Sequence, residues 1–140
     1  MLIETTDAIV ERLKALCPAA KGNVFDTADL AGVKAKSQIT PALHVVLFDY
    51  APADVVDGEG LWDETYFVIA VVKNASRDRV AGQRSEAATL LNEALQALSG
   101  WQPASSTAQL NVVPGPRPWP SATHAYFPLA FVGRPVTGRD

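Results

Sequence analysis

The stretch "VVKNASRDRVAGQRSEAATLLNEALQALSGWQP", residues 71–103, decides the fold. It opens with the apolar end of a predicted strand, passes through a charged segment and enters a helix that we expect to begin between Arg77 and Gly82. Alanine-rich apolar positions at helical spacing predict that one side of this helix lies closely on a sheet. The predicted buried stripe is Ala87, Ala88, Leu91, Ala94, Leu95 and Leu98.

The end of this helix is also specified by sequence. Gly100 is predicted to be the left-handed residue after the last turn, and Trp101 the apolar contact that folds back on it. Pro103 prevents the helix from resuming. We interpret Trp101 as a core side chain, so that Trp101→Ala should cost about 3–5 kcal/mol.

A second helix is predicted in "MLIETTDAIVERLKAL", residues 1–16. Thr5 or Thr6 is the expected N-cap, Asp7 suits the positive end of the helix, and Pro18 should end it. After it we expect a short strand at residues 24–25 and one helical turn capped by Asp26 or Thr27. The predicted buried stripe of the first helix is Ile9, Val10, Leu13, Leu16 and Cys17.

The remaining apolar segments predict strands. Trp62, Tyr66, Val68 and Val72 should share one strand face, and Phe67, Ile69 and Val71 the other. Pro128 lacks a donor for a sheet ladder, which predicts an edge strand or a bulge there. The order of elements predicts an α+β fold with a mostly antiparallel or mixed sheet and two main helices packed on it. The expected strands are 42–50, 61–74, 108–113 and 125–133, with a loop at 51–60.

The composition is that of an ordinary globular domain. The chain has 140 residues, 48% hydrophobic and 19% charged, which favours a single domain over 1–140. The single Cys17 excludes an intramolecular disulfide and fits a reducing cytosol. The N-terminus is unlike a signal peptide, and no apolar run reaches the roughly 18 residues of a membrane span, so we expect no membrane partner. A net charge of −3 gives no reason to expect nucleic-acid binding.

Candidate catalytic residues are few. His44 lies in an apolar strand and is interpreted as a core histidine. His124 lies beside Ser121 and Thr123, but residues so close in sequence rarely form a triad, and we interpret the group as a cap at the start of a strand. Cys17 is expected to be a buried small hydrophobic residue. We find no phosphate-binding loop or zinc ligand set, and therefore predict no catalytic residue, cofactor or metal.

One acidic segment qualifies this prediction. It has six carboxylates and no basic residue, and carboxylate oxygens are calcium ligands, although the D-x-D-x-D-G pattern is absent. We favour a solvated acidic loop, with a small metal-dependent hydrolase that uses this loop and His124 as an alternative. The six acids are Asp49, Asp54, Asp57, Glu59, Asp63 and Glu64.

A basic segment follows the long strand, with Lys73, Arg77, Arg79 and Arg84. Positive charge at the start of a helix opposes the helix dipole, so an acidic partner there would relieve a cost. The acidic loop of the same chain offers such a partner. We hypothesise that Asp54, Asp57 and Glu59 of one copy meet Arg77, Arg79 and Arg84 of the next in a closed ring, and that reversing Arg77 and Arg79 to Glu abolishes the ring at low salt.

The proline-rich stretch "PGPRPWPS", residues 114–121, has two interpretations. Alternating prolines favour a stiff extended loop that costs little entropy to dock, in which Arg117 and Trp119 form a partner surface. A peptide-binding module with Trp119 as its anchor belongs to this interpretation. In the other, Trp119 packs back on its own sheet.

The layout resembles that of the small tail proteins of Mu-like bacteriophages, the tail-terminator-like proteins. The resemblance rests on "MLIETTDAIVERLKAL", "TPALHVVLFDY", "WDETYFVIAVVKN" and above all "AGQRSEAATLLNEALQALSGWQP", and it spans nearly the whole chain. These motifs are architectural rather than catalytic.

The resemblance implies a non-enzymatic virion protein. Such proteins form a homohexameric ring on the head-proximal end of the tail tube, stop polymerisation of the tube and, in contractile tails, of the sheath, and contact the head-side connector. Genomic DNA passes through the lumen without specific binding. The implied location is the head-proximal end of the tail, and the host cytoplasm during assembly. Another neck or tail-completion protein, such as a head–tail adaptor, is the alternative within this class.

Overall fold

The computed structural model describes residues 2–36, 39–56, 59–73, 80–121 and 123–134. Within these ranges only the backbone is described for residues 2–4, 53–56, 59–61 and 80–83. The elements, in chain order, are α1 (Leu2–Leu16), the 3-10 turn η1 (Pro18–Ala20), β1 (Val24–Asp26), α2 (Leu30–Ala35), β2 (Ala42–Val56), β3 (Glu59–Lys73), α3 (Val80–Leu98), β4 (Asn111–Val113), β5 (Trp119–Pro120) and β6 (His124–Gly133).

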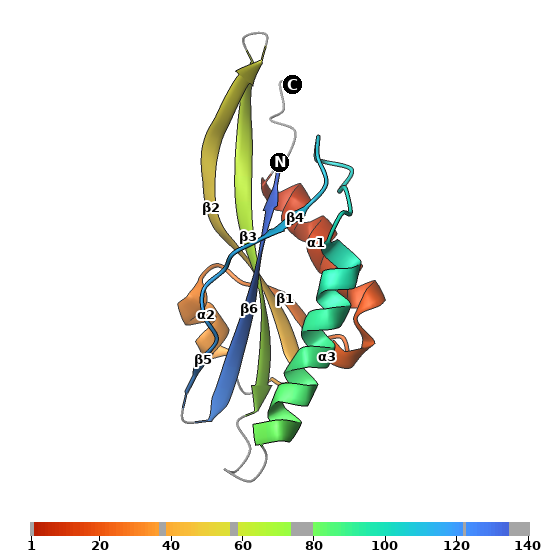
Figure 1. Ribbon diagram of the computed structural model, residues 1–140, viewed down its shortest axis with the longest axis vertical. Coiled ribbons are helices and arrows are strands. Elements are labelled where there is room, and N and C mark those ends of the chain that lie inside the picture. The colour runs from red at the N-terminus through yellow and green to blue at the C-terminus, as the bar shows by residue number, and fades with distance from the viewer. Residues whose placement is uncertain (1, 37–38, 57–58, 74–79, 122, 135–140) are drawn as a thin grey trace.

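The strands form one mixed sheet in the order β1-β2-β3-β6-β4, with β5 also paired to β6. Only β1 and β2 run parallel, because the chain crosses through α2 between them; the other pairs are antiparallel. The helices α1 and α3 lie side by side on one face of the sheet (Figure 1). The α+β prediction with two main helices on a mixed sheet is therefore confirmed.

The main core lies between the sheet and these two helices. Tyr66, Val68 and Val72 of β3 face it, as alternation predicts, while Phe67, Ile69 and Val71 face a smaller cluster under α2 on the other side. The α1 prediction holds for four positions of its stripe, but Leu16 is 47% exposed. The four are Ile9, Val10, Leu13 and Cys17.

The predicted α3 stripe needs two corrections. Ala88 is exposed, and Leu90 and Ala97 are buried in addition to the predicted Ala87, Ala94 and Leu98. The difference is a rotation of the apolar stripe on the helix, which small alanines on several sides do not fix from sequence alone. Leu91 and Leu95, also predicted, are partly buried against the same cluster.

Two cap assignments differ from the sequence predictions. Because α1 already begins at Leu2, Thr5 and Thr6 are buried within the helix rather than capping it. The short helix α2 is capped by Asp29, whose carboxylate accepts a hydrogen bond from the Gly32 amide at 2.8 Å, and not by Asp26 or Thr27. The end of α1 just before Pro18, and the strand near residue 24, are as predicted.

The end of α3 follows the predicted plan. Gly100 has a positive φ of 75°, and its amide bonds to the Leu110 carbonyl at 2.9 Å. Trp101 packs against the main core but is only half-buried, and the Arg12 guanidinium lies over its ring, 4.7 Å from the centroid. Trp101 is thus a cover on the core rather than a fully buried plug.

The sheet differs from prediction most at β2. Residues 51–56 and 59–60, expected in a loop, continue β2 and β3 as a long hairpin, with irregularities between Leu47 and Asp49 and between Pro52 and Val55. Cross-strand pairing overrides the turn preference of individual residues here, and the bulges absorb the mismatch. Of the expected 108–113 strand, only Asn111–Val113 pairs with β6.

Pro128 lies in an interior strand, contrary to the edge-strand prediction. β6 pairs with β3 along its whole length without a bulge. On its other side, β4 pairs with residues 130–132 and β5 with residues 125–126. Pro128 therefore sits in the interval between two short partner strands, so β6 is an edge only locally, at the residue that lacks a donor.

Candidate functional site

The hairpin of β2 and β3 extends beyond the rest of the sheet. β6 pairs with β3 only from Glu64 onward, and β1 pairs only with residues 43–45 of β2. Residues 51–56 and 59–63 therefore form a two-stranded ribbon that projects at one end of the molecule (Figure 1). We call this ribbon, together with Asp49 and Tyr50 that lead into it on β2, the arm. It contains most of the acidic segment noted in the sequence.

Aromatic side chains are exposed on and beside the arm. Tyr50 is 56% exposed, and its ring is tilted against that of Trp62 with centroids 6.0 Å apart. At the base, Phe48 is 57% exposed and stacks on Phe67 at 4.2 Å. Phe48 also borders an apolar groove of about 430 Å³ between β2 and residues 28–31. Both exposed rings belong to β2, beyond the residues that pair with β1.

The free edge of the arm is unsuited to adding a further strand. The bulge after Leu47 twists the strand, and the Asp49 carboxylate accepts a hydrogen bond from the Tyr50 amide at 2.9 Å. Pro52 has no amide donor at all. Natural sheets use these devices to prevent edge pairing. A partner on the β2 side of the arm would therefore bind through side chains.

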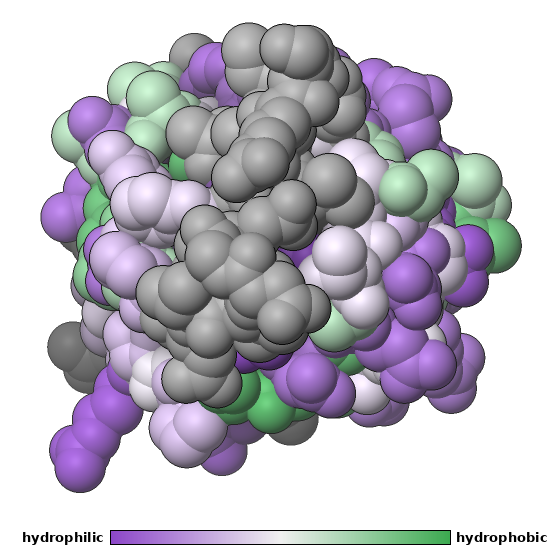
Figure 2. Space-filling model, turned by 90° about the horizontal axis from the view of Figure 1, so that it is seen from above, coloured by the Kyte–Doolittle hydropathy of each residue, from purple (hydrophilic) through white to green (hydrophobic). Residues whose placement is uncertain are grey.

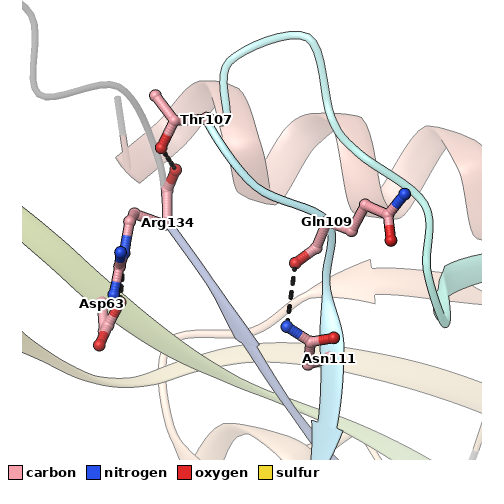
Figure 3. Close-up of polar contacts among 5 residues, drawn as sticks. All are labelled: Asp63, Thr107, Gln109, Asn111 and Arg134. Atoms are coloured by element: carbon pink, nitrogen blue, oxygen red, sulfur yellow. Dashed lines mark hydrogen bonds and ion pairs between the residues drawn. The ribbon is translucent and has the colours of Figure 1, made fainter.

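The base of the arm is held by polar contacts with other elements. Arg134, at the end of β6, donates to Asp63 at 2.9 Å, and its carbonyl accepts hydrogen bonds from the amide and hydroxyl of Thr107 (Figure 3). Asp63 and Arg134, with Gln109 and Asn111, line a polar notch of about 270 Å³. Asp63 is thus neutralised in place, which leaves it poorly suited to bind a metal.

Glu64 is a buried acid beside this notch and is only 2% exposed. The Tyr66 hydroxyl donates a hydrogen bond to its carboxylate. Burial raises the pKa of Glu64, against the opposing effect of the Tyr66 hydrogen bond, and burial together with the nearby carboxylate raises the pKa of Tyr66. The pair lies on the core face of β3, and nearby the Thr5 hydroxyl of α1 contacts the Ser105 hydroxyl at 2.8 Å.

The opposite end of β3 is basic. Lys73 ends the strand and is exposed, and Arg84 in the first turns of α3 is exposed at the same end (Figure 1). A 15-residue strand holds its two ends roughly 46 Å apart. Arg77, Arg79 and Asp57 lie outside the described residues. Asp54 and Glu59 lie on the strands of the arm, where only the backbone is described.

The residues considered for catalysis are not brought together. His124 pairs in register with Lys73, nine strand positions and roughly 30 Å from Glu64, so the acidic segment and His124 cannot share a site. The His124 amide bonds to the Ser121 hydroxyl at 3.0 Å and its ring to Thr123 at 2.7 Å, which matches the predicted cap at the start of a strand. Among the residues described, no group of three metal-ligating side chains is found.

The other two candidate groups are buried. The His44 ring bonds to Thr27 at 2.8 Å through Nδ1, while Nε2 has no hydrogen-bond partner; burial, with a smaller effect of Lys36, lowers its pKa to about 4. Burial and the charge of Glu93 raise the pKa of the Cys17 thiol to about 11, so that it is not a nucleophile near neutral pH.

The position of Trp119 decides between the two interpretations of the proline-rich segment. Its ring stacks on Tyr126 at 5.1 Å with an interplanar angle of 12°, so it packs on its own sheet and is not a projecting anchor. Arg117 is exposed. Gly115 lies close over Ala130, where an added Cβ would approach the Ala130 Cβ to 3.1 Å. The segment is therefore laid along the sheet.

The molecule seen from the arm end is mostly hydrophilic, with apolar residues in separate small patches (Figure 2). No helix among the described residues is long and apolar enough to span a membrane. Sequence reasoning missed the exposure of Phe48 and Tyr50 and the burial of Glu64. Alternation along β2 and β3 assigns each of the three side chains to a face of the sheet. It does not show which part of that face is covered by other elements.

Comparisons with known proteins agree with this architecture. A family model described as "Phage tail terminator protein" matches residues 3–139. Among solved structures, a chain of "Virion of native gene transfer agent (GTA) particle" superposes with a TM-score of 0.60 at 18% sequence identity, covering 96% of both chains. At that identity the likeness concerns the fold. No curated protein matches the chain.

Proposed function

The chain belongs to the phage tail terminator family, and from this premise we propose that it forms a ring on the head-proximal end of the tail tube. There it stops tail polymerisation and joins the tail to the head connector. The observation that carries the proposal is the family match over residues 3–139, nearly the whole chain. The fold shared with a chain of a virion particle accords with it.

The proposed role depends on shape and contact rather than chemistry. Two helices pack on a single sheet, and among the described residues the one long projection is the arm at one end (Figure 1). We propose that the protein is not an enzyme. Its partners are then other copies in a hexamer, the tail tube protein, the sheath protein in contractile tails and the head-side connector. Genomic DNA passes through the lumen without specific binding, in keeping with the net charge of −3.

Light scattering and negative-stain imaging of the same purified fractions test the proposal. We expect sixfold rings with a central hole that bind one end of isolated tail tubes and stop further addition of tube protein. A monomer that neither binds tubes nor limits their length would contradict it. Antibody labelling of virions on the portal side of the neck, rather than at the tube end, would assign the chain to a different neck position.

A metal titration tests the enzymatic alternative. Trp62 lies on the arm against Tyr50, so its fluorescence reports on any ion that binds the acidic segment. We expect no saturable change with calcium or magnesium, because Asp63 is paired with Arg134 and Glu64 is buried against Tyr66. A saturable change would favour a metal site.

A further inference from the structure

The arm is an unpartnered part of the sheet with a defined surface chemistry. Two-stranded ribbons are marginally stable in water by themselves, so a long one gains stability from a packing partner. Its β2 edge is closed to strand addition by the bulge, by Asp49 and by Pro52. A partner on the β2 side therefore engages side chains, and the described ones include the exposed Tyr50 and the ring of Trp62 beside it.

These side chains, with the acids of the arm, are suited to cations. Aromatic faces attract ammonium and guanidinium groups, and carboxylates bind guanidinium through two parallel hydrogen bonds. Residues 49–64 contain six carboxylates and no basic residue, so no cation within the arm itself can occupy them. Two of the six have described partners from elsewhere: Asp63 is paired with the Arg134 side chain, and the buried Glu64 accepts a hydrogen bond from Tyr66. The surface chemistry of the arm thus calls for a basic partner surface.

The same chain displays such a surface at its other end. Lys73 and Arg84 are exposed there, and Arg77 and Arg79 lie between them in sequence. The two surfaces cannot meet within one molecule, because β3 itself runs from one to the other and separates them by roughly 46 Å. Two different surfaces at opposite ends of a subunit make a head-to-tail contact, the type that closes into rings.

We propose that the arm of one copy docks on the basic end of the next copy, with Arg84 and Lys73 against the carboxylates and aromatic rings of the arm. This inference rests on the proposed ring and adds the contact that closes it. The second copy is preferred over another basic protein because both halves of the contact are present on one chain, with complementary charge and opposite placement.

Charge reversal with exchange tests the contact. One variant carries Asp54→Lys and Glu59→Lys in the arm, and a second carries Lys73→Glu and Arg84→Glu at the basic end. Each alone should lose rings at about 50 mM salt, where charges are screened only beyond about 14 Å. Mixed together, they should form rings again, because in an alternating ring every arm meets an end of opposite charge. A chain with all four changes should also form rings.

A matched control for the variant at the basic end carries Lys21→Glu and Lys34→Glu, which make the same change in net charge at exposed sites outside the arm and the basic end. It should form rings like the unmodified chain, and the thermal melting of every variant shows whether it folds. Rings that persist in both reversal variants overturn the contact and leave the proposed function standing. Rings that persist while tube binding is lost also overturn the contact between copies and leave the proposed function standing. They would indicate that the arm binds the tube protein. An unmodified chain that forms no ring, alone or on tubes, overturns both proposals.

Discussion

Replacement of Tyr66 by Phe isolates the polar pair at the base of the arm. Tyr66 and Glu64 lie on the core face of β3, with Tyr66 fully buried and Glu64 2% exposed. The Tyr66 hydroxyl is the donor to a carboxylate that is largely removed from water. Phe keeps the ring in its packing and removes only this donor. A buried acceptor left without its partner costs about 1–3 kcal/mol, and more when it is charged.

The pH dependence distinguishes this account from a simple packing defect. Burial raises the folded-state pKa of Glu64 above its ordinary value of 4.5, and the Tyr66 hydrogen bond opposes the rise. For a raised pKa, the contribution to stability is complete below pH 4.5 and is lost as pH rises through the folded pKa. Without the Tyr66 donor the pKa rises further. The deficit of Tyr66→Phe should therefore be largest near neutral pH and shrink toward pH 4.5.

Urea unfolding of four chains measures the effect: the unmodified protein, Tyr66→Phe, Glu64→Gln and the double variant. Glu64→Gln retains an acceptor for Tyr66 but cannot ionise, so Tyr66→Phe should cost only about 1 kcal/mol in that background and the same at every pH. Equal costs of Tyr66→Phe in both backgrounds, or a cost that does not vary with pH, would show that the carboxylate is not held by this hydroxyl.

Three further predictions concern the core. Trp101→Ala should lower the free energy of unfolding by about 2–3 kcal/mol, less than for a fully buried ring, because Trp101 is half-buried under Arg12; a cost below about 1 kcal/mol in urea unfolding would contradict this. Gly100→Ala should destabilise by at least about 1 kcal/mol through its φ of 75°, and an unchanged melting midpoint would refute the strain. Burial lowers the pKa of His44 to about 4, so its stabilising effect should be lost as pH falls from 6.5 toward 4. His44→Leu should then flatten the pH dependence of the free energy of unfolding over this range. An unchanged slope would exclude His44 as the source of that dependence.

Much of the fold could be predicted because local rules agree with the tertiary structure there. The alternation of Phe67 and Val68 assigned the two faces of β3, and Gly100 marked the end of α3. Predictions failed where pairing or packing overrides local preference. Residues 51–56 read as a loop from their turn-forming types, but β3 supplies partners for them, and bulges fit them to the strand. Ala88 failed because an alanine does not distinguish a buried face from an exposed one.

The candidate interface was predictable in charge but not in geometry. The acidic and basic segments are visible in sequence, because they depend only on residue type. Their placement at opposite ends of one strand depends on where β6 and β1 stop pairing with the hairpin, which local pattern does not encode. The sequence left two interpretations of Trp119 open for the same reason, and its stacking on Tyr126, where β5 pairs with β6, agrees with the one in which it packs on its own sheet.

The unbroken length of β3 has a mechanical consequence. In the proposed ring each copy would contact a neighbour at both ends of this strand. Tension around the circumference would then be transmitted through one continuous backbone and through its hydrogen bonds to the adjacent strands. The repeat distance would then be set by a count of residues, about 3.3 Å for each, and would be insensitive to side-chain repacking. Internal pressure on such a ring would load covalent bonds and sheet hydrogen bonds in shear, whereas helix α1, which takes no part in the proposed contact, would carry little of the force.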